Sequence, residues 1–162
     1  MATVDGFLEL DGVKGESTDA KHKDKIEIQS FQWGVHSASN MATGGGGGVG
    51  KAVFSDFTIT KKVDLASPVL AKFAATGEHI AKGKVIFRKA GGSAGQQDYQ
   101  TYDFEKIYVT GLAVSGSQDG EFYETLTLSP TKFKWEYKKQ GDKGSLEGNT
   151  VVTVDRAKNT AA

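Results

Sequence analysis

Lys132–Lys138 reads KFKWEYK, and it shows the two-residue alternation of a half-buried β-strand. Its aromatic side chains, Phe133, Trp135 and Tyr137, fall on one face, while three lysines and a glutamate fall on the other. Because successive side chains of a strand point to opposite faces, one face packs on a core and the other meets solvent. This stretch predicts a β protein.

The segment just before it has the same period. FYETLTLS spans Phe122–Ser129, and its residues Phe122, Leu126 and Leu128 share one face. Pro130 follows at once, and proline removes a backbone donor that a sheet interior needs. We therefore expect two strands that meet at Pro130 and form a hairpin.

Similar alternation recurs along most of the chain. It covers Gly6–Leu10, Ile26–Ser37, Val53–Val63, Lys84–Lys89, Tyr99–Val114 and Thr150–Val154. The apolar parity changes between Ile28 and Phe31, which indicates a β-bulge, and we expect a second bend near Lys106. Long bent strands separated by glycine-rich turns favour a barrel or sandwich.

One segment has the helical period instead. Ser67 is the expected N-cap, Pro68 the first helical residue and Gly77 the C-terminal stop. The apolar face of this short helix comprises Val69, Leu70, Phe73 and Ala74. We expect it to cover an open end or side of the barrel.

The fold class that follows is mainly β. We expect a small β-barrel of two packed antiparallel sheets, with one short α-helix on its side and an extended glycine-rich loop. The 162 residues match the size of one compact domain, so residues 1–162 are expected to form a single domain.

Charge and composition exclude several functions. Twenty Lys plus Arg balance twenty Asp plus Glu, so a nucleic-acid partner is not expected. The chain has no cysteine, which excludes disulfides, thiolate metal sites and cysteine nucleophiles. No stretch resembles a membrane span or an N-terminal signal peptide. The protein is expected to be cytoplasmic on synthesis, without membrane insertion.

The stretch that most resembles a ligand site is GGGGVGKA, from Gly45 to Ala52. It is one residue short of the phosphate-binding pattern G-x-x-x-x-G-K-[ST], because Ala52 replaces the hydroxyl that ligates magnesium. A phosphate loop also runs into a helix, whereas the residues after Lys51 alternate as a strand does. We favour a loop that becomes ordered against another protein chain.

Other candidate chemistry is weak. His22, His36 and His79 are scattered and are expected to be isolated surface or turn residues. The carboxylates of Asp5, Glu9 and Asp11 are expected to belong to a solvated surface of mixed charge. No G-x-S-x-G nucleophile motif occurs. We predict no catalytic residue, no metal site and no cofactor.

Several short motifs, taken in series, resemble one known family. They are VKGES (Val13–Ser17), GGGGGVGK (Gly44–Lys51), DFTITK (Asp56–Lys61), SPVL (Ser67–Leu70), GEH (Gly77–His79) and RKAGG (Arg88–Gly92). Their order and spacing are similar to those of the haemolysin-coregulated proteins, Hcp, which form the tube of the bacterial type VI secretion system. The resemblance extends from about Gly6 to about Tyr137 and is loose after Gly144.

The resemblance implies a structural role. It implies a homohexameric ring, stacking of rings into a tube, and expulsion of the tube by a contractile sheath with a tip spike protein. Effector proteins would travel in the lumen, and the protein would be secreted without an N-terminal signal peptide. The family's glycine loop corresponds here to Ala42–Lys51, so Met41, Gly44, Gly46, Gly48 and Lys51 are the expected subunit or ring-to-ring contacts.

A second hypothesis stays open at this point. A β-barrel enzyme or ligand-binding protein could use residues 44–51 to bind a nucleotide. Loss of ATP binding on Lys51→Ala would support it, whereas a six-chain assembly would support the tube subunit.

Overall fold

The computed structural model describes residues 4–39, 49–89 and 95–162. Its elements, in chain order, are β1 (Val4–Leu10), β2 (Ile26–Ile28), β3 (Ser30–Gln32), β4 (Val35–Ser39), β5 (Val49–Phe54), β6 (Phe57–Lys62), α1 (Ser67–Thr76), β7 (His79–Lys89), β8 (Gln97–Ser115), β9 (Tyr123–Gln140), β10 (Leu146–Asp155) and β11 (Thr160–Ala161). The prediction of a mainly β fold with a short helix is confirmed.

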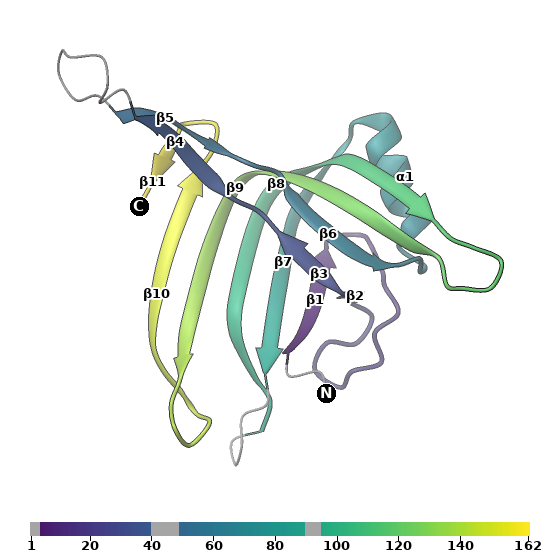
Figure 1. Cartoon of the computed structure of the whole chain (residues 1–162), viewed down its shortest axis with the longest axis horizontal. Helices are drawn as coiled ribbons and strands as arrows, with labels where there is room; N and C mark the ends of the chain where they lie inside the picture. The colour runs from purple at the N-terminus through teal and green to yellow at the C-terminus, as the bar shows by residue number, and fades with distance from the viewer. Residues whose placement is uncertain (1–3, 40–48, 90–94) are drawn as a thin grey trace.

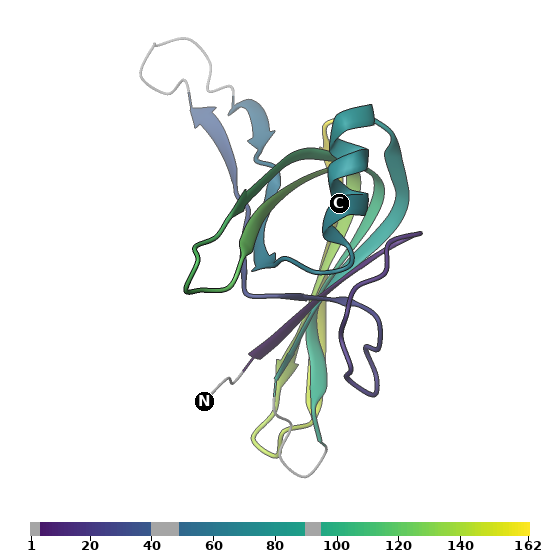
Figure 2. The same ribbon diagram turned by 90° about the vertical axis from the view of Figure 1, so that its right-hand side faces the viewer.

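Within the described ranges, nine strands form one curved antiparallel sheet, and β4 pairs with β5 in a second sheet. The large sheet runs β11-β10-β9-β8-β7-β1-β2, and β6 joins β9 to β3. The sheet is not closed into a barrel by strand pairing. Among the described strands, β2 pairs only with β1, and β3, which follows it, pairs only with β6. The two sheets match the predicted architecture, although the smaller one is a hairpin that extends away from the larger (Figures 1 and 2).

The predicted hairpin at Pro130 is wrong, because both segments belong to the single strand β9. One edge of β9 pairs with β6 up to Leu128 and with β10 from Lys132 onward. Pro130 lies between these two partners, where its missing N–H interrupts neither ladder. Strand β8 pairs along both halves of β9 on the other edge.

Two predicted irregularities are confirmed. The parity change falls at Gln29, which separates β2 from β3. The bend in β8 falls at Lys106, whose φ of 47° is unusual for a residue with a side chain. The extra residue of β8 in its ladder with β9 is nearby at Thr110, because Val109 pairs with Leu128 and Gly111 with the adjacent Thr127.

The helix begins one residue earlier than predicted. Ala66 is the N-cap and Ser67 is the first helical residue, so the assignment of Ser67 as N-cap is wrong. The Ser67 hydroxyl is instead buried and donates to Glu124 Oε1 over 2.7 Å. Gly77 ends the helix as predicted, with φ of 72° in the left-handed region.

The core lies between the curved sheet and α1. Leu70 is fully buried, and the other three predicted helix residues pack against the same cluster. Aromatic rings fill its centre: Phe57 has ring neighbours at 4.8 to 5.8 Å in Phe31, Trp33, Tyr102, Phe104 and Phe133. Phe133 is buried and Trp135 partly buried, as the alternation of KFKWEYK predicts, whereas Tyr137, the third residue of the predicted inner face, is 39% exposed.

Candidate functional site

A loop between β1 and β2 covers the outer face of the sheet. Phe7 and Ile86 are paired across β1 and β7 and point away from the main core, yet both are almost fully buried. Gly15 allows the loop to fold back on itself, because a Cβ there would lie 2.5 Å from the carbonyl oxygen of Lys25. The loop thus forms a second, smaller packed layer.

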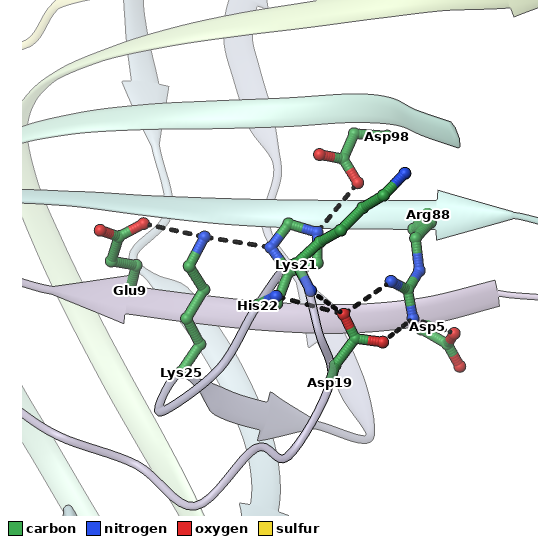
Figure 3. A network of polar contacts seen from close by, with 8 residues as sticks. All are labelled: Asp5, Glu9, Asp19, Lys21, His22, Lys25, Arg88 and Asp98. Atoms are coloured by element: carbon green, nitrogen blue, oxygen red, sulfur yellow. Dashed lines mark hydrogen bonds and ion pairs between the residues drawn. The ribbon is translucent and has the colours of Figure 1, made fainter. Parts of the chain in front are cut away.

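Arg88 on β7 holds this loop in place (Figure 3). Its guanidinium donates to both carboxylate oxygens of Asp19, at 2.9 and 2.8 Å, and to Asp5 at 3.0 Å. These bonds raise the pKa of Arg88, and the bond from Arg88 lowers the pKa of Asp19 well below its usual range. Bidentate Arg–carboxylate pairing fixes position as well as charge.

His22 is buried, so its assignment as an isolated surface residue is wrong, although it does lie at a turn, in which the Lys25 N–H donates to the His22 carbonyl oxygen at 3.3 Å. The ring stacks on Phe7 at 4.6 Å. Nε2 bonds to Asp98 Oδ1 at 3.1 Å, and Nδ1 accepts from the Lys25 ammonium at 3.0 Å (Figure 3). The loop is therefore held to the sheet by Asp19 on Arg88 and by His22 on Phe7 and Asp98. Sequence alone offered no signal that His22 and Asp98, 76 residues apart, would meet.

Replacing Asp19 with asparagine should loosen the loop, because the bidentate bonds to Arg88 and the charge are both lost. We expect faster trypsin cleavage after Lys21 and Lys23, both exposed, with the rest of the chain protected. Cleavage kinetics at neutral pH measure this. Asp119→Asn, in an exposed turn, is the matched control, and equal cleavage rates for the two variants would contradict the role given to Asp19.

The same ion pair predicts a pH dependence. The folded-state pKa of Asp19 lies below the ordinary value of 3.8, so its contribution to stability is complete above that pH. The contribution falls as the pH drops from 3.8 toward the folded-state pKa. Wild type should therefore lose its advantage over the asparagine variant only in strong acid, as acid-unfolding curves would show.

Strands β4 and β5 form an arm that projects from the body (Figures 1 and 2). Trp33 fixes its root: the indole Nε1 donates to the Tyr102 hydroxyl at 2.9 Å, and the ring stacks on Phe57 at 5.3 Å. Lys51 is exposed on β5. Of the other predicted contact residues, Met41, Gly44, Gly46 and Gly48 lie outside the described residues.

The nucleotide hypothesis loses its structural support. Lys51 lies within strand β5, and the next element is strand β6, whereas a phosphate loop runs into a helix.

Over residues 4–39, 49–89 and 95–162, no group of three histidine or carboxylate side chains is placed to hold a metal ion. His36 and His79 are exposed, and the Asp5 and Glu9 carboxylates pair with Arg88 and Lys25.

A buried ion cluster joins α1 to the sheet. Lys61 on β6 and Glu124 on β9 form an ion pair, and neither side chain is exposed. The Lys61 ammonium also donates to Asp64 Oδ1 at 2.7 Å and to the Ser67 hydroxyl at 3.3 Å. The cluster fixes the start of the helix over β6 and β9.

These features define a class: a mainly antiparallel β protein with a single packed helix in its described part, a projecting two-stranded arm, and polar clusters that hold segments in place. In the described ranges, no helix is long and apolar enough to cross a membrane.

The family model described as "Type VI secretion system effector, Hcp" matches residues 7–137. The chain belongs to the Hcp family of type VI secretion proteins. It is 32% identical to Protein hcp1 of Pseudomonas aeruginosa over 149 residues, which cover 91% of each chain. It is 25% identical over 159 residues to the Major exported protein of the same organism, covering 94% of this chain and 90% of that one.

A solved structure shares the fold. The crystal structure of Hcp1 from Salmonella typhimurium is similar, with a TM-score of 0.81 and 34% identity over 99% of this chain and all of that chain. The family resemblance drawn from the sequence motifs is confirmed by these matches.

Proposed function

We propose that this protein is the structural subunit of a type VI secretion inner tube. Six copies join head to tail in a ring with a central hole, rings stack, and sheath contraction expels the tube with effectors in its lumen. The match of residues 7–137 to the Hcp family carries this proposal. Each subunit is one domain that spans residues 1–162.

The free edges of the large sheet support association. Within the described residues, β2 pairs on one edge only, and β10 pairs with β11 only at Val154 and Asp155. Unpaired strand edges offer backbone donors and acceptors to another chain. A head-to-tail contact joins two different surfaces, and such contacts close into a ring when the rotation divides a full turn evenly.

The arm suits a second kind of contact. We propose that its glycine-rich end, with Met41, Gly44, Gly46, Gly48 and Lys51, touches a neighbouring subunit or the next ring. The projection of β4 and β5 from the body supports this (Figure 2). Glycine permits close approach of another backbone because it has no side chain.

The remaining parts of the proposal concern partners and chemistry. The subunit is not an enzyme and needs no cofactor. Its partners are further copies of itself, a tip spike protein, a contractile sheath and effector proteins. It is made in the cytoplasm and then secreted, and its secretion agrees with the name of the exported relative.

Electron microscopy tests the proposal. Wild-type protein should form six-fold rings that stack at high concentration. Replacing Gly44–Gly48 with bulky charged residues should leave the rings but abolish stacking, because the body of the sheet does not depend on these residues. Circular dichroism checks that the variant is folded. Particles without six-fold symmetry in wild type would refute the ring, and stacked tubes of the variant would refute the role of the loop.

A further inference from the structure

His22 is a buried histidine whose two ring nitrogens both have charged partners (Figure 3). Its side chain is 5% exposed. Nε2 bonds to the Asp98 carboxylate, and Nδ1 bonds to the Lys25 ammonium. An ammonium donates hydrogen bonds and accepts none, so Nδ1 must lack a proton and Nε2 must carry the proton that bonds to Asp98. The arrangement is therefore that of a neutral imidazole.

A proton added to this ring has to go on Nδ1, where it faces the Lys25 ammonium at 3.0 Å. The acceptor to which Lys25 donates becomes a second donor, and two positive charges then lie in contact. The Lys25 side chain is 20% exposed, so water screens this repulsion poorly. Asp98 opposes the effect, because a carboxylate favours the imidazolium. Its side chain is 43% exposed, however, and exposed ion pairs contribute little.

The remaining charges near the ring do not offset this repulsion. They are Glu9 and Asp5 of β1, Asp19 and Lys21 of the loop, and Arg88 of β7 (Figure 3). The Glu9 carboxylate already bonds to the Lys25 ammonium at 3.1 Å, and both aspartates already bond to Arg88. Lys21 adds positive charge. A protonated His22 would thus add a further cation beside Lys25 without gaining a new anionic partner.

The turn that carries His22 depends on its side-chain contacts. Asp24 has a φ of 63°, which is uncommon for a residue with a side chain and persists where the surroundings hold it. Backbone bonds close the turn: the Asp24 N–H donates to the Ser17 carbonyl oxygen at 2.8 Å, and the Lys25 N–H to that of His22 at 3.3 Å. These two amides therefore report whether the turn is closed.

We propose that His22 is a pH-sensitive latch, whose protonation in mild acid breaks the bond from Lys25 and releases the turn of residues 20–25 from the outer face of the sheet. Histidine is the side chain whose charge ordinarily changes between about pH 5 and 8. The released form binds one more proton than the closed form, so falling pH favours release. Release uncovers Phe7, which is 3% exposed and stacks on His22 in the closed form. The latch does not depend on the proposed ring.

The loop stays tethered at Asp19 while the turn is released. The hydrogen bond from Arg88 holds the pKa of Asp19 well below its usual range, so this carboxylate is still charged in mild acid. The two attachments thus respond to different ranges of pH, mild acid for His22 and strong acid for Asp19. The loop uncovers the outer face only in part.

Hydrogen–deuterium exchange followed by mass spectrometry tests the latch. The peptide that covers residues 18–26 is labelled at about pH 7.5 and about pH 5.5, with labelling times scaled for the intrinsic rate of amide exchange. We expect its protection to fall roughly tenfold in mild acid, while the protection of β9 stays constant. Equal protection of residues 18–26 at the two pH values overturns the proposal.

Three variants identify the cause of the fall in protection. H22Q cannot take up the proton, and K25M lacks the ammonium that the proton would face, so neither variant should show the fall. K25M keeps the His22 ring on Phe7 and Asp98, so it decides the matter even where H22Q opens the turn at both pH values. K23M removes an exposed lysine of the same loop and should keep the fall. A fall that persists in K25M, or one that is lost in K23M, overturns the role of the His22–Lys25 contact.

Discussion

Replacing Lys61 with methionine should lower the free energy of unfolding by about 3–5 kcal/mol, the range for breaking a buried ion pair. The Lys61 and Glu124 side chains are both fully buried, so the substitution leaves an unpaired carboxylate away from water. Among the described residues, Glu124 Oε2 has no hydrogen-bond partner even in the intact protein, and the lysine is therefore the main compensation for its charge. Urea unfolding at a fixed protein concentration measures the loss.

The double variant K61M with E124L is the matched control. Removing both charges leaves no fully buried ion in this cluster, because the remaining Asp64 carboxylate is 11% exposed and still accepts from the Ala66 N–H, so most of the lost stability should return. Equal destabilisation of the single and double variants would contradict the account, because shape rather than charge would then decide the outcome. Amide exchange in α1 should rise in the single variant, because Lys61 and Ser67 tie the helix start to the sheet.

Phe57→Ala should cost about 3–5 kcal/mol of stability, as expected for a fully buried aromatic side chain. Phe57 has no exposed surface and lies at the centre of the ring cluster. Its loss also frees Trp33, which stacks on it and fixes the root of the arm. We therefore expect a local effect on β4 and β5 in addition to the global one.

Tryptophan fluorescence reports the local effect. The chain has two tryptophans, and Trp33 packs against Trp135 with ring centroids 5.5 Å apart. Both emission maxima should shift to longer wavelength in the folded Phe57→Ala variant as water enters. Val53→Ala, at a 52% exposed site on the arm, should change stability by less than about 0.5 kcal/mol. Similar losses for the two variants would contradict the central role of Phe57.

Period-two patterning predicted the β class, the inner face of β9 and the two irregularities, because alternation reports which face is buried. It could not predict that Pro130 lies inside a strand. That depends on a change of neighbour from β6 to β10, which is a long-range property. Capping preference also misplaced Ser67, since a tertiary bond to Glu124 engages its hydroxyl.

The polar clusters were partly readable. Lys61 shares its parity with Phe57 and Ile59, and Glu124 shares its parity with Leu126, so the alternation could have placed both side chains inward, although neither residue was singled out from the sequence. Two inward charges of opposite sign are a signal of a buried pair. The Arg88 cluster had no such signal, because it needs the β1–β2 loop to fold over the outer face of the sheet.

The molar mass of the protein in solution tests the central claim most directly. Each chain has a mass of 17.3 kDa, so a hexameric ring has six times that, or about 104 kDa. Size-exclusion chromatography with light scattering should give this mass for the main species across a broad range of concentrations. A single species of one-chain mass throughout that range would contradict the assignment as a ring-forming tube subunit.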